Sequence, residues 1–163
     1  MKIIKASLSD YNVIHAIALT TWHATYNDIL SPDQMEYMLE MMYSNEAIAD
    51  QIAIKGHHFL LAEEEGEYLG FASYELNSLS ETTKLHKLYV LPQAHGKGVG
   101  KALVTVIQNA AKSNNNNKII LNVNKHNPAI NFYLKSGFIN KGEDIIDIGN
   151  GYIMDDYLMM KEL

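Results

Sequence analysis

The sequence predicts one α+β domain in which helices cover both faces of a mixed, mostly antiparallel central sheet. Three observations predict it. The chain has 163 residues, the length of a single domain, so residues 1–163 are expected to form one unit. It contains no internal repeat and no linker rich in Pro, Gly or Ser. Its hydrophobic pattern passes from helices to an antiparallel meander, and then through a strand–helix–strand crossover to a helix and two strands.

The first third of the chain is expected to be mainly helical. Residues 2–6 form a short strand, and a helix capped by Ser9 or Asp10 follows it. The apolar residues of that helix recur at helical spacing at Val13, Ile14, Ile17 and Ala18. Residues 31–34 begin a second helix, because a capping serine, a proline at the first helical position and a glutamine three residues after the serine coincide. Ser44 begins a third, short helix.

From His57 onward the pattern changes to strands. A glutamate- and glycine-containing turn separates the first two strands, Pro92 ends the third, and Gly137 ends the last helix. The expected elements are strands over 59–62, 68–76, 85–91 and 118–124, helices over 98–112 and 128–136, and two closing strands that turn at 149–151.

The composition excludes several classes of protein. Hydrophobic residues make up 47% of the chain and charged residues 20%, which is an ordinary globular mixture. The absence of cysteine excludes disulfides, thiolate nucleophiles and cysteine zinc sites. A net charge of −6 disfavours nucleic acid and favours a cationic small substrate. Neither a signal peptide nor an apolar run long enough for a membrane span is visible, so a cytoplasmic protein without a membrane partner is expected.

The most informative segment is residues 88–103, where a strand ends at a proline and alternating glycines lead into a helix. Glycine allows bare backbone amides to approach a ligand, and a helix N-terminus adds partial positive charge. This arrangement predicts an anion site suited to a phosphate or pyrophosphate. A nucleotide P-loop does not fit, because His95 replaces its first glycine and Ala102 replaces its magnesium-binding hydroxyl. The dinucleotide fingerprint also fits poorly, because the glycine spacing differs and the next strand ends at Asn124 without an acidic residue.

The segment resembles the acetyl-CoA motif [QR]-x-x-G-x-[GA] of the GNAT superfamily of N-acetyltransferases, with Gln93, Gly96 and Gly98 at its positions. The resemblance implies that amides of the turn bind the pyrophosphate. It also implies that the strand before the turn pairs with the pantetheine arm and polarises the thioester carbonyl. The residues expected to bind acetyl-CoA are Leu88, Tyr89, Val90, Gln93, His95, Gly96, Lys97, Gly98, Val99, Gly100, Lys101 and Asn127.

A second motif resembles the other half of the same fold, which reads V-x-x-x-N-x-x-A-x-x-x-Y-x-x-x-G-F. Its named residues are supplied by Val123, Asn127, Ala129, Tyr133, Gly137 and Phe138. Asn127 lies two residues before Ala129, where three are usual, which leaves its contact with the coenzyme open. The resemblance implies that Tyr133 is catalytic and protonates the departing thiolate, because expulsion of a thiolate needs an acid.

The acceptor side is expected to involve the N-terminal helices, and the run from residue 31 to 44 resembles PaiA-type bacterial acetyltransferases, whose acceptors are polyamines. The predicted substrate-binding residues are Trp22, Tyr26, Glu75 and His86. Met38 and Met42 are candidates for an apolar lining, although core packing is the favoured explanation for the methionines. The amine must lose a proton before attack, and the candidate bases are His86, Glu75 and His23. Carboxylates that could hold a distal ammonium are Glu36, Glu75, Asp155 and Asp156. The seven histidines show no metal-binding spacing, so no metal is expected.

Together these features predict an acetyl-CoA-dependent N-acetyltransferase in which a small-molecule or peptide amine attacks the thioester directly in a ternary complex. A CoA-binding regulatory domain with little turnover is the alternative. The sequence does not distinguish a monomer from a homodimer.

Overall fold

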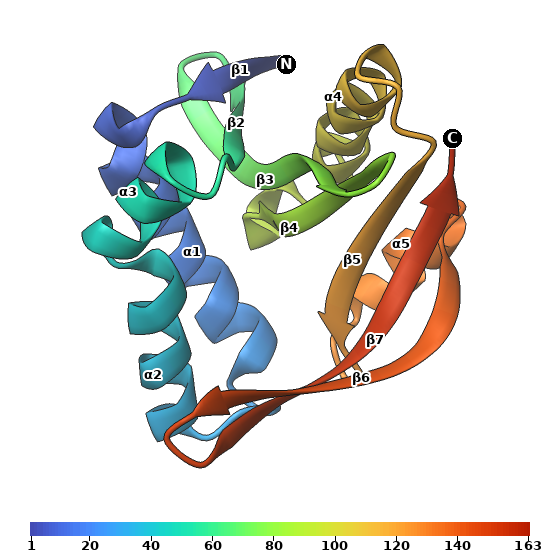
Figure 1. The fold of residues 1–163 in the computed structure, drawn as a ribbon. Coiled ribbons are helices and arrows are strands. Elements are labelled where there is room, and N and C mark those ends of the chain that lie inside the picture. Colours follow the sequence, from blue (N-terminus) through green and yellow to red (C-terminus); the bar gives the residue numbers. More distant parts are fainter.

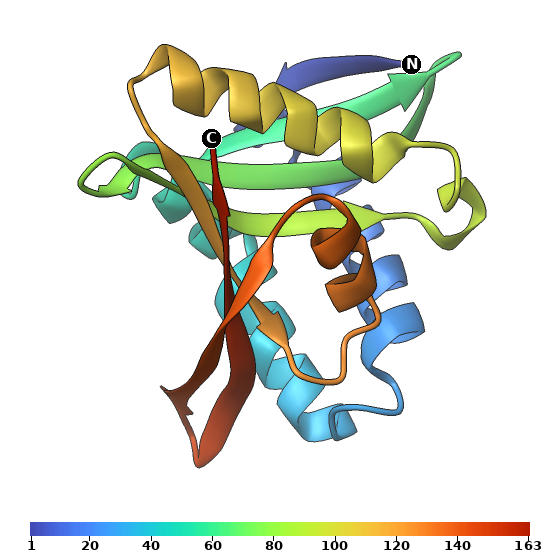
Figure 2. The same cartoon turned by 90° about the vertical axis from the view of Figure 1, so that its right-hand side faces the viewer.

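The structure, a computed structural model, describes residues 1–163 and has a seven-stranded sheet with helices on both faces (Figures 1 and 2). The strand order is β1-β2-β3-β4-β5-β7-β6, and only the β4–β5 pair is parallel. The predicted α+β class and the mixed, mostly antiparallel sheet are therefore confirmed. No helix is both long and apolar enough to cross a membrane.

The helices and strands follow one another in the expected order. The strands are β1 (Lys2–Ala6), β2 (His58–Glu64), β3 (Glu67–Leu79), β4 (Thr82–Val90), β5 (Lys118–Asn124), β6 (Ile139–Gly149) and β7 (Tyr152–Glu162). The helices are α1 (Tyr11–Tyr26), α2 (Pro32–Tyr43), α3 (Asn45–Ala53), α4 (Val99–Ser113) and α5 (Ala129–Lys135), with short 3₁₀ turns at Leu8–Asp10 and Pro92–Ala94.

Strand β2 contributes side chains to two hydrophobic cores, one on each face of the sheet. Phe59 and Leu61 point into the cluster under α1, α2 and α3, whereas Leu60 and Ala62 point into the cluster under α4 and α5. The alternation follows from the two-residue period of a strand. Burial of each large apolar side chain contributes about 1.5–3 kcal/mol. Figure 1 shows α1–α3 on one side of the sheet and α4 with α5 on the other.

The predicted side-chain caps are present at the N-termini of α2 and α3, whereas the cap predicted for α1 lies one turn earlier. Ser31 accepts the amide proton of Gln34 at 3.2 Å, and Ser44 accepts that of Ala47 at 3.1 Å. Asp10 precedes α1, but its carboxylate accepts the amide proton of Ser7 at 2.9 Å. The acidic cap therefore closes the 3₁₀ turn in front of α1 and makes no side-chain hydrogen bond to α1 itself.

The hairpin between β3 and β4 is longer than the sequence predicts. The stretch from Asn77 to Thr83 is polar and lacks a strand-like pattern, yet it pairs because a distant side chain supports it. The buried amide of Asn116 accepts from the Asn77 amide at 3.1 Å and from the Thr83 hydroxyl at 2.7 Å. It also donates to the Asn77 side chain at 2.7 Å and to the Asn114 carbonyl at 3.0 Å. A tertiary contact thus decides this local structure.

Replacement of Asn116 by Ala is expected to lower the free energy of unfolding by about 3 kcal/mol, because it leaves several buried polar groups unpaired. Urea denaturation followed by circular dichroism measures the change. Asn109→Ala, at an exposed position of α4 whose side chain makes no hydrogen bond, is the matched control and should cost nothing. Equal stability of the two variants would contradict this role of Asn116.

Strands β4 and β5 pair over only four residues each. Thr82–Leu85 lies beside Lys118–Leu121, and beyond these residues the strands diverge, as Figure 1 shows. A bulge in β4 begins where they part: Leu85 lies opposite Tyr74 and Lys87 lies opposite Ser73, which leaves His86 as the extra residue. Bulges of this kind re-aim side chains and are frequent near active sites.

Candidate active site

The glycine turn lies at one end of a groove of about 390 Å³, which we call the glycine groove. Its wall includes Leu88, Tyr89, Val90, Ala94, His95, Gly96, Gly98, Val99, Gly100, Asn127, Pro128, Ala129, Phe132 and Tyr133. Gly96 and Gly98 adopt φ values of +81° and +77°, a region that favours glycine. Neither of their amides donates to a backbone carbonyl, and the first amides of α4 have no carbonyl one turn earlier. The turn therefore presents a set of free donors, which suits a pyrophosphate.

Three residues predicted to bind the coenzyme lie outside this groove. Gln93, Lys97 and Lys101 are exposed and do not contribute to its wall. His95 does contribute, and its Nε2 lies 3.0 Å from the carbonyl oxygen of Val90. That carbonyl therefore points away from β3, and the amide of Val90 points the same way by strand geometry.

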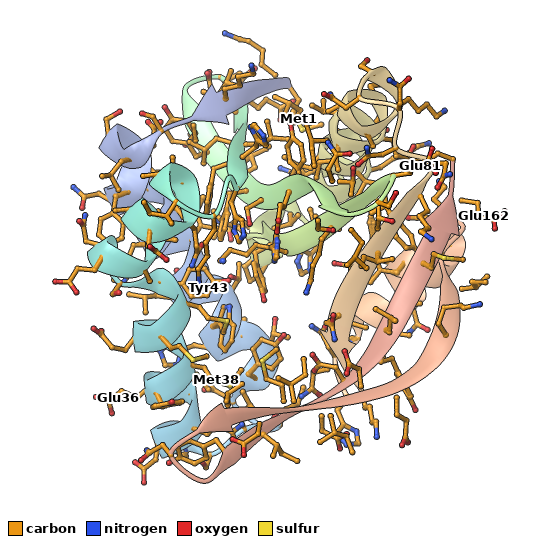
Figure 3. All side chains as sticks on the ribbon, viewed as in Figure 1. Met1, Glu36, Met38, Tyr43, Glu81 and Glu162 are labelled. Atoms are coloured by element: carbon orange, nitrogen blue, oxygen red, sulfur yellow. The ribbon has the colours of Figure 1, made fainter.

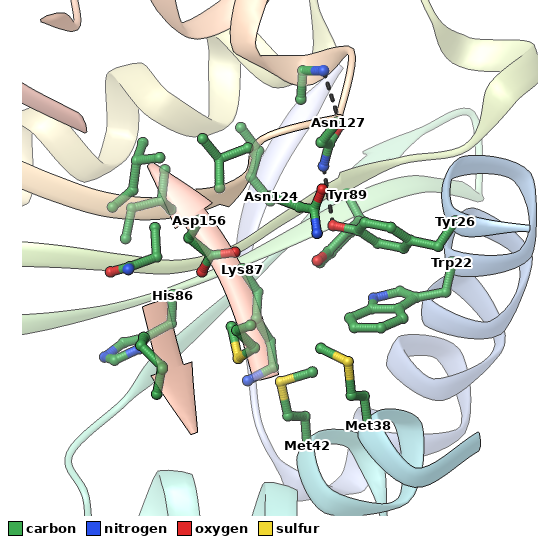
Figure 4. Close-up of a pocket in the computed structure, with 18 of the residues that line it drawn as sticks. Trp22, Tyr26, Met38, Met42, His86, Lys87, Tyr89, Asn124, Asn127 and Asp156 are labelled. Atoms are coloured by element: carbon green, nitrogen blue, oxygen red, sulfur yellow. Dashed lines mark hydrogen bonds between the residues drawn. The ribbon is translucent and has the colours of Figure 1, made fainter. Parts of the chain in front are cut away.

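A second cavity, of about 290 Å³, lies on the face of the sheet covered by α1 and α2 (Figure 4). We call it the helix-side cavity. Its apolar wall includes Trp22, Tyr26, Met38 and Met42, so the N-terminal helices do enclose a cavity. Figure 3 shows Met38 and Tyr43 directed inward from α2, whereas Glu36 points outward. Met38 also belongs to the hydrophobic core, so the methionine packs and lines the cavity at once.

The groove and the cavity share a wall. Leu88, Tyr89, Asn127, Ala129 and Tyr133 contribute to both. Tyr133 is buried on α5, and burial, followed by the neighbouring Tyr26, raises the pKa of its hydroxyl well above the ordinary value. The phenol therefore remains protonated at neutral pH and can act as a proton donor between the two spaces.

Asn127 fixes this wall from both sides. Its carbonyl oxygen accepts the amide proton of Ala129 at 2.9 Å, which holds the start of α5. Its amide nitrogen donates to the Tyr26 hydroxyl at 3.0 Å, which joins α5 to α1. Asn127 lines the glycine groove, but both ends of its side chain already have protein partners. Its geometry is that of a residue that positions Tyr26 and α5.

Aromatic rings fill the space between the helices and β4. Trp22 lies 4.6 Å from Tyr26 and 5.7 Å from Tyr43 between ring centres, and its indole N–H donates to the Tyr43 hydroxyl at 3.3 Å. Burial raises the pKa of Tyr26, Tyr43 and Tyr89. The predicted substrate-binding residues Trp22 and Tyr26 thus form a rigid wall.

Two further charged residues line the helix-side cavity: Lys87, which the sequence did not identify, and Asp156, which it offered as one of four carboxylates for a distal ammonium. Lys87 is buried, its ammonium donates to Gln51 Oε1 at 2.8 Å, and burial together with Lys55 lowers its pKa to about 7. Asp156 on β7 is 2% exposed, and burial, with Asp144 and Asp155 nearby, raises its pKa to about 6. Asp156 appears in the sequence only as one of several acidic residues in a polar strand, so no local pattern distinguishes it.

The predicted residues Glu75 and His86 contact one another. Glu75 Oε1 lies 2.9 Å from His86 Nε2 and 3.6 Å from His57 Nε2, and the two imidazoles stack with centres 3.9 Å apart. Burial lowers the pKa of His86 to about 3 and that of His57 to about 4. His86 lines the helix-side cavity, whereas Glu75 stands behind it. The ligand atoms of these three residues lie within 4.8 Å of one another, and in this structure Glu75 and His86 form a hydrogen bond while the two rings stack.

His23, another candidate base, does not reach this cavity. It is exposed on α1, its Nδ1 lies 3.4 Å from Asn27, and it lines a separate surface groove between α1 and α2. Helical spacing explains the result, since Trp22 and Tyr26 are four residues apart and share the buried face, which turns His23 outward. Neither His23 nor Glu36 can contact a molecule in the helix-side cavity from these positions.

The groove with its free amides and the helix-side cavity thus meet at a buried tyrosine. A family model described as an acetyltransferase (GNAT) domain matches residues 26–153. The chain belongs to this GNAT family and is an acyltransferase, which confirms the family predicted from the two motifs.

Individual relatives are similar to this chain over most of its length. A spermidine N(1)-acetyltransferase of Thermoplasma acidophilum is 27% identical over 95% of this chain and 96% of its own. A 5-NmdU N-acetyltransferase of Pseudomonas phage PaMx11 is 32% identical over 68% of this chain and 74% of its own. The crystal structure of the PaiA N-acetyltransferase of T. acidophilum in complex with coenzyme A shares the fold, with a TM-score of 0.83, 24% identity, and coverage of 99% of this chain and 98% of that one.

Proposed function

We propose that the protein transfers an acetyl group from acetyl-CoA to a primary amine, and that the preferred acceptor is a small polyamine. The observation that carries the proposal is the shared wall of the glycine groove and the helix-side cavity, which contains Tyr133. A coenzyme in the groove and an amine in the cavity would meet there. The similarity to a spermidine acetyltransferase over nearly the full length supports a polyamine acceptor.

The groove contains what acetyl-CoA requires. Free amides of Gly96, Gly98 and the first turn of α4 would bind the pyrophosphate. The divergence of β4 from β5 leaves the amides of Leu88 and Val90 without a partner strand, and these could pair with the pantetheine arm. An amide of this segment would also stabilise negative charge on the thioester oxygen during attack.

The transfer would be direct. The amine nitrogen attacks the thioester carbon, the C–S bond breaks, and Tyr133 donates its proton to the sulfur. The chain has no cysteine that could carry the acetyl group, and the shared wall allows the two substrates to be bound at the same time. Holding both reactants in one geometry supplies much of the rate enhancement in such reactions.

Mixing the purified protein with acetyl-CoA and a panel of polyamines, amino acids and peptides tests this proposal. We expect amine-dependent release of free thiol, fastest with a polyamine. Calorimetry with coenzyme A on the same sample is the control for binding. Tight coenzyme binding without thiol release for any amine would instead favour a CoA-binding regulatory domain.

A further inference from the structure

Asp156 is the only acidic side chain in the wall of the helix-side cavity. It is 2% exposed, and its Oδ2 has no hydrogen-bond partner. Figure 4 shows its carboxylate between His86 on one side and Tyr26 with Asn124 on the other. Burial of a carboxylate oxygen without a partner is costly and needs an explanation. A cation bound in the cavity would provide the missing partner.

The position of Asp156 links it to the shared wall. It lies opposite Asn124 at the end of β5, just before the loop that leads through Asn127 to α5. The charge of Asp156 contributes to the raised pKa of Tyr26, and Tyr26 in turn contributes to that of Tyr133. Asp156, Tyr26 and Tyr133 all line the helix-side cavity, and their charges influence one another there.

We propose that Asp156 binds the reacting ammonium group of the acceptor and takes its proton, so that the acceptor is an aliphatic primary amine. This inference rests on the proposed function and names the base that the sequence left unassigned. The apolar wall formed by Trp22, Met38 and Met42 suits the alkyl chain of such an amine. Two cations, Lys84 and Lys87, share the wall, so Asp156 is its only anionic partner for an ammonium group.

Two protons leave the amine nitrogen during the transfer. The ammonium gives one proton to the Asp156 carboxylate, and the free amine forms the N–C bond. The C–S bond breaks and the thiolate takes the proton of Tyr133. The second proton of the amine leaves as the amide forms and restores the Tyr133 hydroxyl through solvent, while Asp156 returns its proton to solvent. The products are an amide, a thiol and one proton.

The groups around Asp156 shift the pKa of its carboxyl toward the value that a general base needs. Burial raises its pKa most, and the carboxylates of Asp144 and Asp155 add to the rise. Asn122 and Lys84 oppose the rise, and together these groups place the pKa at about 6. The carboxylate is ionised at neutral pH but is more basic than a solvated one, as a general base should be. The charged or titratable groups around it are Asp144 on β6, Asp155 on β7, Lys84 and His86 on β4, and Tyr26 on α1.

The test compares Asp156→Asn with the wild-type protein, using butylamine and diaminobutane as acceptors between about pH 5 and pH 9. We expect kcat/KM of the wild type to fall below about pH 6 as Asp156 becomes protonated. Asp156→Asn should lose this acidic limb and lower kcat/KM about 30-fold for both amines. Asp155→Asn is the matched control, since Asp155 is paired with Lys125 at 2.7 Å and lies outside the cavity. Asp155→Asn should keep the acidic limb of kcat/KM, and the limb should move to lower pH because the Asp155 charge no longer raises the pKa of Asp156.

Each contrary outcome has a distinct meaning. A loss confined to diaminobutane would show that Asp156 holds a distal ammonium and would overturn its role as base. An acidic limb that persists in Asp156→Asn would overturn it as well. Failure of the wild type with both alkylamines, while another amine class is acetylated, would overturn the assigned acceptor. Only failure with every amine would overturn the proposed function, and calorimetry with coenzyme A verifies that each variant is folded.

Discussion

Replacement of Tyr133 by Phe is expected to lower kcat about 100- to 1000-fold while KM for acetyl-CoA changes little. The phenol lies on the wall shared by the glycine groove and the helix-side cavity, and it carries its proton at neutral pH. Phenylalanine keeps the ring and its contacts with Phe132 and Phe138 but cannot protonate a thiolate. Steady-state thiol release measures the effect.

The matched control removes a hydroxyl elsewhere. Tyr74 on β3 is also buried and has a raised pKa, but its ring stacks on His58 and lines neither the groove nor the helix-side cavity. Tyr74→Phe should therefore retain wild-type turnover. Unchanged turnover in Tyr133→Phe would exclude Tyr133 as the acid and leave solvent to protonate the sulfur.

Replacement of Gly98 by Val is expected to weaken binding of coenzyme A about 100-fold. Gly98 has a φ of +77° and precedes α4, so a β-branched side chain strains the backbone that presents the free amides. The side chain would also enter the groove through which the pyrophosphate must approach. Titration calorimetry with coenzyme A measures the affinity directly.

Gly66→Val is the matched control, because it distinguishes the effect of backbone strain from a loss of coenzyme binding. Gly66 has a φ of +83° and, like Gly98, has open space around the position of the missing Cβ, but it lies in the β2–β3 hairpin. Both variants should lose comparable stability, and only Gly98→Val should lose coenzyme affinity. Equal affinities in the two variants would remove the glycine turn from the coenzyme site.

The sequence predicted those parts of the site that follow local rules. The proline, the glycines and the helix start fix the turn around Gly98, and motif spacing places Tyr133 on the helix after β5. The two meet because β4 and β5 are parallel neighbours, so the segments after both strands lie at the same edge of the sheet.

The residues that escaped prediction depend on long-range structure. Simple strand alternation places His86 and Lys87 on opposite faces, but the bulge turns both toward α1–α3, which brings His86 to Glu75 and buries Lys87. Asp156 is one of four carboxylates that the sequence offers for an ammonium group, and no local pattern marks it as the buried one. It becomes buried only when β7 inserts between β5 and β6, an arrangement that a single sequence does not reveal.

The divergence of β4 and β5 has a consequence for self-association. Past Leu85 and Leu121, each strand has one side with no neighbour, although both lie in the middle of the sheet. Natural proteins protect such edges because any extended peptide can add to them. The gap that would receive pantetheine therefore also leaves backbone groups to which a strand from another molecule could add. A ligand that fills it would guard the protein against aggregation.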